Sequence, residues 1–288
     1  MTENDSLTRR FESSHARLRA MAYRMLGSLS DAEDAVQEAW IRAAGADADA
    51  VANLEGWFTT IVARVCLDML RSRRSRREEP FDPETAPADA DPEQEAVLAD
   101  SVGLALLVVL DTLAPAERVA FVLHDTFGLP FAEIAAITGR SPAAARQLAS
   151  RARRRLQGPT ALPAARLARR RKVADAFLAA TRHGDIEALL AVLDPDVVLH
   201  ADAAAVPTGT AMTLRGATAV ARGARAASAY SRHSGVALID GTPGIVMAAH
   251  GRLVIVLTFV IPEDRITRIE VIADPARLGQ LELAVPDG

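Results

Sequence analysis

The segment from Phe131 to Leu156 constrains the fold most, because it has the pattern of two short helices joined by a tight turn. Apolar residues fall at helical spacing in its first half, and Thr138-Gly139 supplies the break. Ser141 predicts an N-cap for the second helix, with Pro142 at the first helical position, where a missing amide hydrogen costs nothing. This arrangement is typical of a helix-turn-helix.

The second helix of this motif is strongly basic. Residues 141–156 contain five Arg and no acidic residue. Arg binds guanine or phosphate through its forked guanidinium and Gln pairs with adenine, so an outward face of these residues can read bases and hold the backbone. The alternative is a solvated basic helix. We predict DNA contacts for the following residues of this face: Arg146, Gln147, Ser150, Arg151 and Arg154.

The chain as a whole does not have the composition of a nucleic-acid binder, since its 288 residues carry a formal net charge of -4. Local charge decides contact with phosphate, because salt screens charges beyond about 8–10 Å. A second cluster without acidic residues consists of Arg71, Arg73, Arg74, Arg76 and Arg77. The sequence therefore predicts DNA binding through two basic patches of an acidic protein.

Length predicts about two domains with enough material for packed cores. Cys66 is the one cysteine, which excludes an internal disulfide and a multi-thiolate zinc site, and its apolar surroundings favour a buried structural thiol. Four histidines are scattered along the chain without the spacing of metal ligands, namely His124, His183, His233 and His250. We therefore expect no metal and no cofactor. No signal-peptide core or membrane-length apolar run is present, which predicts a cytoplasmic protein without membrane contact.

The chain divides into five predicted stretches. A helical stretch at 1–77 includes a break at Gly27 and a helix that Ser30 is predicted to cap. Residues 78–100 form a linker, because residues 78–95 contain eight acidic residues, four prolines and no Lys or Arg. Helical pattern returns at 101–158, a second linker is predicted at 159–169, and the last domain covers 170–288.

In the last domain helices come first and strands follow. Helices are predicted at 172–182 and 186–193. Strand-like runs follow at 197–200, 235–239, 244–249, 253–260 and 266–272. This order predicts an α+β domain with an antiparallel sheet.

Five sequence motifs, in the same order along the chain, resemble regions 2 and 4 of extracytoplasmic-function (ECF) RNA polymerase sigma factors. They are Ala22–Gly27, Asp31–Trp40, Trp57–Arg64, Leu113–Phe121 and the helix-turn-helix. The resemblance implies a multidomain chain with an all-α region 2 and an all-α region 4. It also implies an alternative sigma factor, which is not an enzyme, with core RNA polymerase and promoter DNA as its partners.

The resemblance also implies roles for individual residues. The acidic second helix of region 2 would dock on the β-prime clamp of polymerase through Asp31, Asp34, Gln37 and Glu38, and region 4 would meet the β flap. Capture and melting of the promoter element nearest the start site would fall to Asn53, Trp57 and Arg64, with the 71–77 Arg cluster on phosphate. The alternatives are a solvated helix face for the acidic residues and a place in the core for Trp57.

Segment 170–284 resembles the SnoaL-like domain, a cone-shaped α+β fold. The motifs that carry this resemblance are Phe177–Ala180, Gly184–Leu190, Leu193–Val198, Leu214–Ala217 and Ala273–Leu278. A fused domain of this kind implies modulation of the sigma regions. Two alternatives stay open: a pocket in which His200 and Asp202 transfer protons, and a pocket that senses an apolar small molecule.

Overall fold

The computed structural model describes residues 3–46, 51–77, 103–158, 162–228, 231, 234–249 and 252–285. Among the sequence predictions, the acidic linker at 78–100, the side chains of Arg76 and Arg77, and His233 and His250 lie outside the described residues. The chain forms two compact units. Unit 1 contains residues 1–95 and 110–154, and unit 2 contains residues 96–109 and 155–288.

Three helices at the start of unit 1 form a small bundle, because each has one apolar face. The stripe predicted on the first helix is buried: Leu18, Met21, Ala22, Met25 and Leu26. The ring of Phe11 lies 5.0 Å from the rings of both Trp40 and Phe58 and so joins the three helices. The helices are α1 (Glu3–Leu26), α2 (Leu29–Ala44) and α3 (Leu54–Arg77).

The start of α2 differs from the prediction. Ser28, and not Ser30, is its N-cap: the Ser28 backbone is extended, and its hydroxyl accepts a hydrogen bond from the Asp31 amide at 3.4 Å. An N-cap needs this extended backbone. Ser30 lies within the first turn, where its hydroxyl is 3.2 Å from that of Ser28.

The helix-turn-helix is confirmed. Helix α7 ends at Gly139, whose φ of 67° is the left-handed conformation that glycine adopts readily. The Ser141 hydroxyl accepts a hydrogen bond from the Ala144 amide at 3.2 Å and caps the next helix. The helices of this stretch are α5 (Leu104–Asp111), α6 (Pro115–Phe121), the π-helical turn η1 (Val122–Thr126), α7 (Phe131–Thr138) and α8 (Pro142–Gln157).

The long helix of unit 2 begins earlier than predicted. Helix α9 (Ala164–His183) includes residues 164–169, which the sequence assigned to a linker. Pro163 precedes it with an extended backbone, and the Ala, Arg and Leu residues that follow are strong helix formers. The other helices of unit 2 are α10 (Ile186–Val192), the 3₁₀ turn η2 (Ala203–Ala205), α11 (Ala217–Ala226) and α12 (Pro275–Leu278).

The α+β architecture of the last domain is confirmed, with one correction to the sheet. Seven strands lie in the order β2-β1-β6-β5-β4-β3-β7. All five predicted strands are present, and the short β2 and β7 were not predicted. Strand β1 runs parallel to β6, whereas the other neighbours are antiparallel. A parallel pair needs a long crossover, and α11 with β3–β5 supplies it. The strands are β1 (Leu193–Ala201), β2 (Met212–Arg215), β3 (Ser234–Ile239), β4 (Thr242–Ala249), β5 (Arg252–Val260), β6 (Ile266–Ile272) and β7 (Leu283–Ala284).

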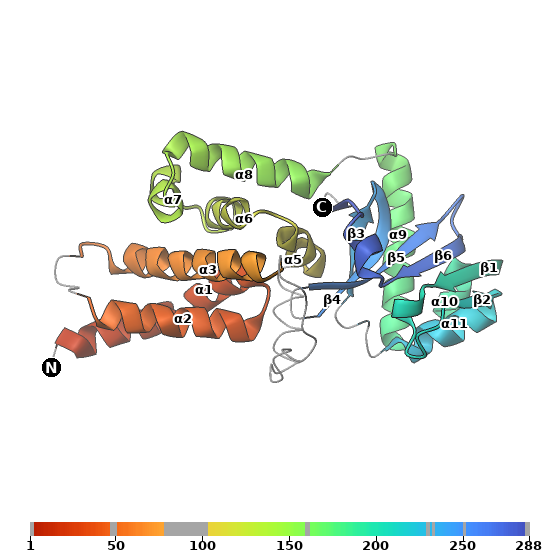
Figure 1. The fold of residues 1–288 in the computed structure, drawn as a ribbon. Coiled ribbons are helices and arrows are strands. Elements are labelled where there is room, and N and C mark those ends of the chain that lie inside the picture. Colours follow the sequence, from red (N-terminus) through yellow and green to blue (C-terminus); the bar gives the residue numbers. More distant parts are fainter. Residues whose placement is uncertain are drawn as a thin grey trace. The chain divides into compact units, whose positions relative to one another are not determined.

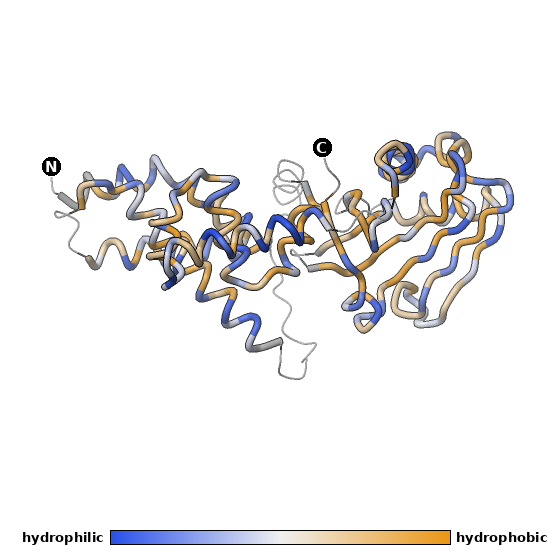
Figure 2. The backbone as a smooth tube through the Cα atoms, turned by 90° about the horizontal axis from the view of Figure 1, so that it is seen from above, coloured by the Kyte–Doolittle hydropathy of each residue, from blue (hydrophilic) through white to orange (hydrophobic). Residues whose placement is uncertain are grey.

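Helices α9, α10 and α11 pack against this sheet around one apolar core (Figure 1). Alternate residues of β1, namely Val197, Leu199 and Ala201, are buried in it. The rings of Phe177 on α9 and Phe259 on β5 lie 5.4 Å apart. Figure 2 shows hydrophobic residues along most of the strands. Packed side chains therefore fill the space between the helices and the sheet.

Candidate nucleic-acid and polymerase interfaces

One face of α2 is exposed, and it carries three of the four predicted polymerase contacts. Asp34, Gln37 and Glu38 are exposed and lie three or four residues apart, so they share one side of the helix. Ile41 continues this face and is 60% exposed. Arg42 forms an ion pair with Glu38 at 2.9 Å. The face thus combines negative charge with one apolar side chain.

Asp31 lies apart from this face. Its carboxylate is half-buried and forms an ion pair with the Arg73 guanidinium, which also donates a hydrogen bond to the Leu26 carbonyl at 3.0 Å. A residue predicted to bind polymerase and a residue predicted to bind phosphate therefore bind each other. In the rest of the Arg cluster, Arg74 is exposed and Arg71 forms an exposed ion pair with Asp68 at 3.6 Å.

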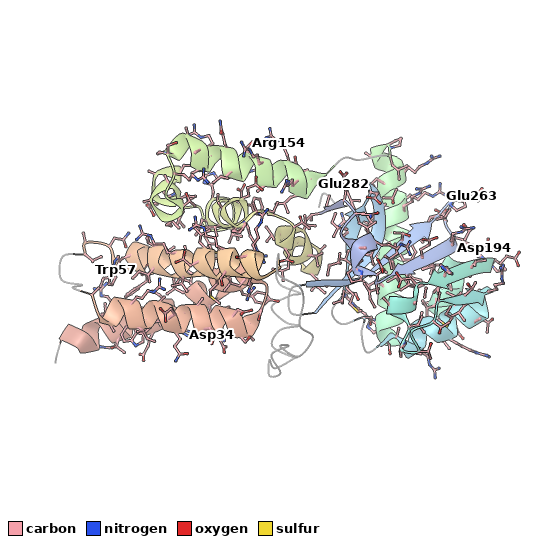
Figure 3. All side chains as sticks on the ribbon, viewed as in Figure 1. Asp34, Trp57, Arg154, Asp194, Glu263 and Glu282 are labelled. Carbon is pink, nitrogen blue, oxygen red and sulfur yellow. The ribbon has the colours of Figure 1, made fainter. Side chains whose placement is uncertain are left out.

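The start of α3 brings together two of the predicted promoter contacts. The Asn53 side chain accepts a hydrogen bond from the Gly56 amide at 3.0 Å and so caps α3. Trp57 is half-buried, with its ring 5.6 Å from that of Phe58, which leaves part of the indole accessible. Figure 3 shows Trp57 near the first turns of α3 and Arg154 toward the last turns of α8.

Arg64, the third residue of α3 that is predicted to bind the promoter, contacts another helix of the protein. Its side chain is exposed, and its guanidinium donates a hydrogen bond to the Ala136 carbonyl of α7 at 3.2 Å. The guanidinium carbon of Arg24 on α1 lies 5.4 Å from the centre of the Phe127 ring. Helix α3 also packs against α6 and α7. The first helical bundle and the helix-turn-helix therefore contact each other within unit 1, which the sequence did not predict.

Helix α8 presents most of its predicted DNA-binding residues to solvent. Arg146, Gln147, Arg151 and Arg154 are exposed, whereas Ser150 is half-buried. The opposite face is buried through Ala145, Ala149, Ala152 and Leu156.

Two contacts fix α8 to the helices before it. The Arg146 guanidinium lies 5.3 Å from the centre of the Phe131 ring, which stacks on the His124 ring at 3.9 Å. Arg153 donates to the Asp125 carboxylate at 2.5 Å. Helix α8 is therefore held at its first turns and in its second half, while Gln147, Arg151 and Arg154 stay exposed.

Unit 2 includes the first turns of α5 and the end of α8, and both of these contact its sheet. A Cβ on Gly235 of β3 would lie 3.2 Å from the Ala105 amide nitrogen, so the first turn of α5 approaches the strand closely. At the other end, the Val285 amide donates to the Leu156 carbonyl at 2.7 Å. Gly158 packs directly against Ala284 of β7.

His200 and Asp202 do not form an acid-base pair in a pocket. His200 is exposed, with Nδ1 3.1 Å from the Thr213 hydroxyl. The Asp202 carboxylate accepts hydrogen bonds from the amides of Ala205, Ala273 and Asp274, each at 3.0 Å. Burial alone would raise the pKa of Asp202, but these three hydrogen bonds and the charge of Arg277 together lower it. Asp202 is therefore an ionised carboxylate that joins two turns.

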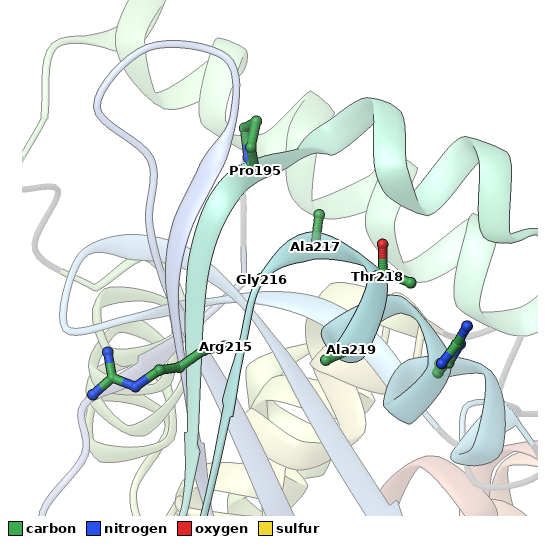
Figure 4. Close-up of a pocket in the computed structure, with 7 residues that line it drawn as sticks. Pro195, Arg215, Gly216, Ala217, Thr218 and Ala219 are labelled. Atoms are coloured by element: carbon green, nitrogen blue, oxygen red, sulfur yellow. The ribbon is translucent and has the colours of Figure 1, made fainter.

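A pocket of about 440 Å³ lies elsewhere in unit 2, at the start of α11. Its lining includes Arg215, Gly216 and Thr218, as well as Arg222 (Figure 4). Neither His200 nor Asp202 lines it. In the part of the chain that the structure describes, no group of three or more His, Cys, Asp or Glu residues is arranged to hold a metal.

Cys66 is fully buried in the bundle, as the sequence predicted. Burial raises the pKa of its thiol to about 12, against smaller opposing effects of Arg118 and Arg73. The described helices include none with both the length and the apolarity of a membrane span.

The two helical stretches each match a known sequence family. Residues 10–76 match Sigma-70 region 2, and residues 103–156 match Sigma-70, region 4. Over 294 residues, which span 100% of both chains, the protein is 33% identical to the probable ECF RNA polymerase sigma factor SigI of Mycobacterium tuberculosis (strain ATCC 25618 / H37Rv). The chain belongs to the ECF RNA polymerase sigma factor family.

Another relative is similar over most of the chain. ECF RNA polymerase sigma factor SigJ of Mycobacterium tuberculosis is 40% identical over 224 residues, which cover 74% of this chain and 70% of SigJ. A crystal structure of SigJ covers 94% of this chain and 98% of its own, at 32% identity and a TM-score of 0.47. As a family member, this ECF sigma factor is a promoter-recognition subunit of RNA polymerase, with α1–α3 as region 2 and α5–α8 as region 4.

Proposed function

We propose that this sigma factor docks on core polymerase through the exposed face of α2 and contacts the promoter at two places. Helix α3 would hold the element nearest the start site through Asn53, Trp57 and Arg64. Helix α8 would lie in the major groove at the upstream element, with its exposed Arg and Gln residues on bases and phosphates. The observation that carries the proposal is that most of the predicted contact residues are exposed, on the three separate helices α2, α3 and α8.

Engagement of the promoter requires the contact between regions 2 and 4 to open. The Arg64 guanidinium that donates to the Ala136 carbonyl is directed toward α7, so it leaves that partner when it meets DNA. Two promoter elements on one duplex also need the two regions apart, whereas α3 packs on α6 and α7 here. The packed arrangement is therefore a resting state of this sigma factor.

A matched pair of variants tests this opening. Arg24→Gln removes the cation from the Phe127 ring, whereas Arg10→Gln removes an exposed cation from the same helix. A cation–π contact contributes about 0.5–1 kcal/mol, so Arg24→Gln should raise run-off transcription about two- to fivefold when sigma factor is limiting. Arg10→Gln should leave it unchanged. Equal output from both variants and the wild type would rule out this contact as a barrier to initiation.

The C-terminal unit would modulate initiation through its hold on region 4. Its sheet contacts the first turn of α5 at Gly235 and the end of α8 through Val285, both within unit 2, so it would constrain region 4 at both ends. The family assignment favours this regulatory role over catalysis. With polymerase as its partner, the protein would act in the cytoplasm.

Run-off transcription with purified core polymerase tests the whole proposal. The template pool would be random-sequence duplexes, from which the holoenzyme selects its own promoters. The full chain would be compared with truncations after Gly158 and after Gly279, the second of which removes β7 and Val285. A truncation more active than the full chain means that the domain restrains region 4, and an inactive one means that the domain supports it. If neither the full chain nor either truncation directs core polymerase to a defined start site, the proposed roles of α2, α3 and α8 are wrong.

A second candidate function, sensing of a small molecule, is favoured by the pocket at the start of α11. It would then involve Arg215 and Arg222 rather than His200 and Asp202. Thermal stabilisation of the full chain by a small-molecule library, lost in Arg222→Gln, would support this candidate.

A further inference from the structure

The first turns of α9 carry a third basic segment. It lies outside α3 and α8, the two helices that are predicted to bind DNA. Residues 166–172 include five cations and no acidic residue, and Lys172 is the one lysine in the chain. Arg166 and Lys172 are exposed, and neither forms an ion pair with the described acidic residues. Two of the other cations are paired, Arg169 with Asp264 and Arg171 with Asp175.

This basic segment is separate from the part of α9 that holds the helix in the fold. The buried residues of α9 begin at Val173 and continue to Thr181. The nine residues from Ala164 to Lys172 have a length of about 13 Å at 1.5 Å per residue. Figure 1 shows this end of α9 extending past the ends of the strands. Its charges are therefore not needed for packing against the sheet.

Arg170 adds a second sign that these charges serve a partner. It is half-buried, and its Nε atom is buried without a hydrogen-bond partner among the described residues. Burial of a cationic nitrogen without an acceptor costs free energy, which a neutral residue would avoid. Folding alone does not account for an arginine at this position.

The chain itself brings this segment close to the DNA-reading helix. Helix α8 ends at Gln157 and α9 begins at Ala164, so six residues separate them. Six residues span at most about 20 Å, which is less than one turn of DNA at about 34 Å. When α8 lies in the major groove, the basic end of α9 is within reach of the neighbouring phosphates.

We infer that the first turns of α9 bind the DNA phosphates next to the upstream promoter element, through Arg166, Lys172 and Arg170. This inference rests on the proposed function, in which α8 occupies the major groove. The contact carries no sequence information, because it goes to the backbone. It raises the affinity of this sigma factor for every duplex by a similar factor and leaves promoter choice to α3 and α8.

Salt dependence of binding by the holoenzyme tests the contact. Arg166→Gln/Lys172→Gln removes two cations, and Gln maintains the helix. The matched control, Arg225→Gln/Arg268→Gln, removes two exposed cations from α11 and β6 of the same unit. Each lost phosphate contact reduces the slope of log affinity against log salt by about 0.9. Between 50 and 200 mM salt, the wild type should therefore lose about tenfold more affinity than the α9 variant, on selected and scrambled duplexes alike.

The conservative change and a direct label complete the experiment. Lys172→Arg should keep the wild-type slope. Acetylation of the Lys172 amine with an amine-reactive ester, read by mass spectrometry, should slow when duplex is added to the holoenzyme. An unchanged slope in the α9 variant, or an equal reduction in the control, overturns the inference. Protection of Lys172 by core polymerase without DNA overturns it in favour of a protein contact.

A fourth variant separates this inference from the proposed function. The variant Arg146→Gln/Arg151→Gln changes α8 and should abolish the preference for selected over scrambled duplexes. If that preference disappears as expected while the α9 variant behaves as wild type, only the inference about α9 fails. If wild-type holoenzyme selects no duplex at all, the proposed function fails first.

Discussion

Replacement of Asp202 by Ala should destabilise the sheet unit because one carboxylate holds two turns together. Its oxygens accept the amide hydrogen of Ala205 in the turn after β1 and those of Ala273 and Asp274 after β6. The Arg277 guanidinium adds an ion pair at 3.7 Å. The side chain is only 13% exposed, so water reaches it poorly.

The size of the effect follows from these contacts. A hydrogen bond to a charged group contributes about 1.5–3 kcal/mol when it is buried, and the turns regain some water when the carboxylate is removed. Three such bonds, partly compensated by water, give about 2–4 kcal/mol for Asp202→Ala. For a unit of this size, 1 kcal/mol corresponds to about 2–4 °C in Tm, so we expect a decrease of roughly 6–12 °C. Asp202→Asn retains one acceptor oxygen and should lose about half as much.

Calorimetry of the full chain measures this prediction, with tryptophan fluorescence as an internal control. Both tryptophans, Trp40 and Trp57, lie in unit 1, so their fluorescence reports that unit alone. Asp194→Asn is the matched substitution, because Asp194 accepts one amide hydrogen bond, from Asp196 at 2.9 Å. If the Asp202→Ala protein unfolds at the wild-type temperature, Asp202 does not hold the two turns together. It would then again be a candidate functional residue.

Three further predictions concern single groups. Gly244→Ala should destabilise the sheet by about 1–3 kcal/mol in urea titrations, because a Cβ there would overlap Ile239 and lie 2.5 Å from a strand carbonyl oxygen. Gly279→Ala is the control and should leave the stability unchanged, because its Cβ would lie 3.4 Å from the nearest atom. Cys66, with its pKa raised to about 12, should react with iodoacetamide at pH 8 only after unfolding; rapid alkylation of the native chain would contradict this. Since folding lowers the pKa of Asp202, its stabilisation is complete above about pH 4 and is lost as pH falls through the folded value, a dependence that urea titrations should find reduced in Asp202→Asn.

Local sequence determined the helices and most of the strands of this protein. The helix-turn-helix could be predicted because its signals are short-range: Gly139 ends one helix and Ser141 caps the next. The exposed faces of α2 and α8 followed from helical periodicity, which places residues three and four apart on one side. The short strand β2 was missed because its four residues have no buried alternation.

Tertiary structure decided which side chains are free to bind. Asp31 and Arg73 belong to separate predicted sites and form one ion pair, because α2 and α3 pack side by side in the bundle. Arg64 lies against α7, 72 residues along the chain, and Asp202 is fixed by amides 71 and 72 residues away. The sequence determines what each side chain can donate or accept, because that depends on residue type. Its actual partner depends on long-range packing, which no local pattern encodes.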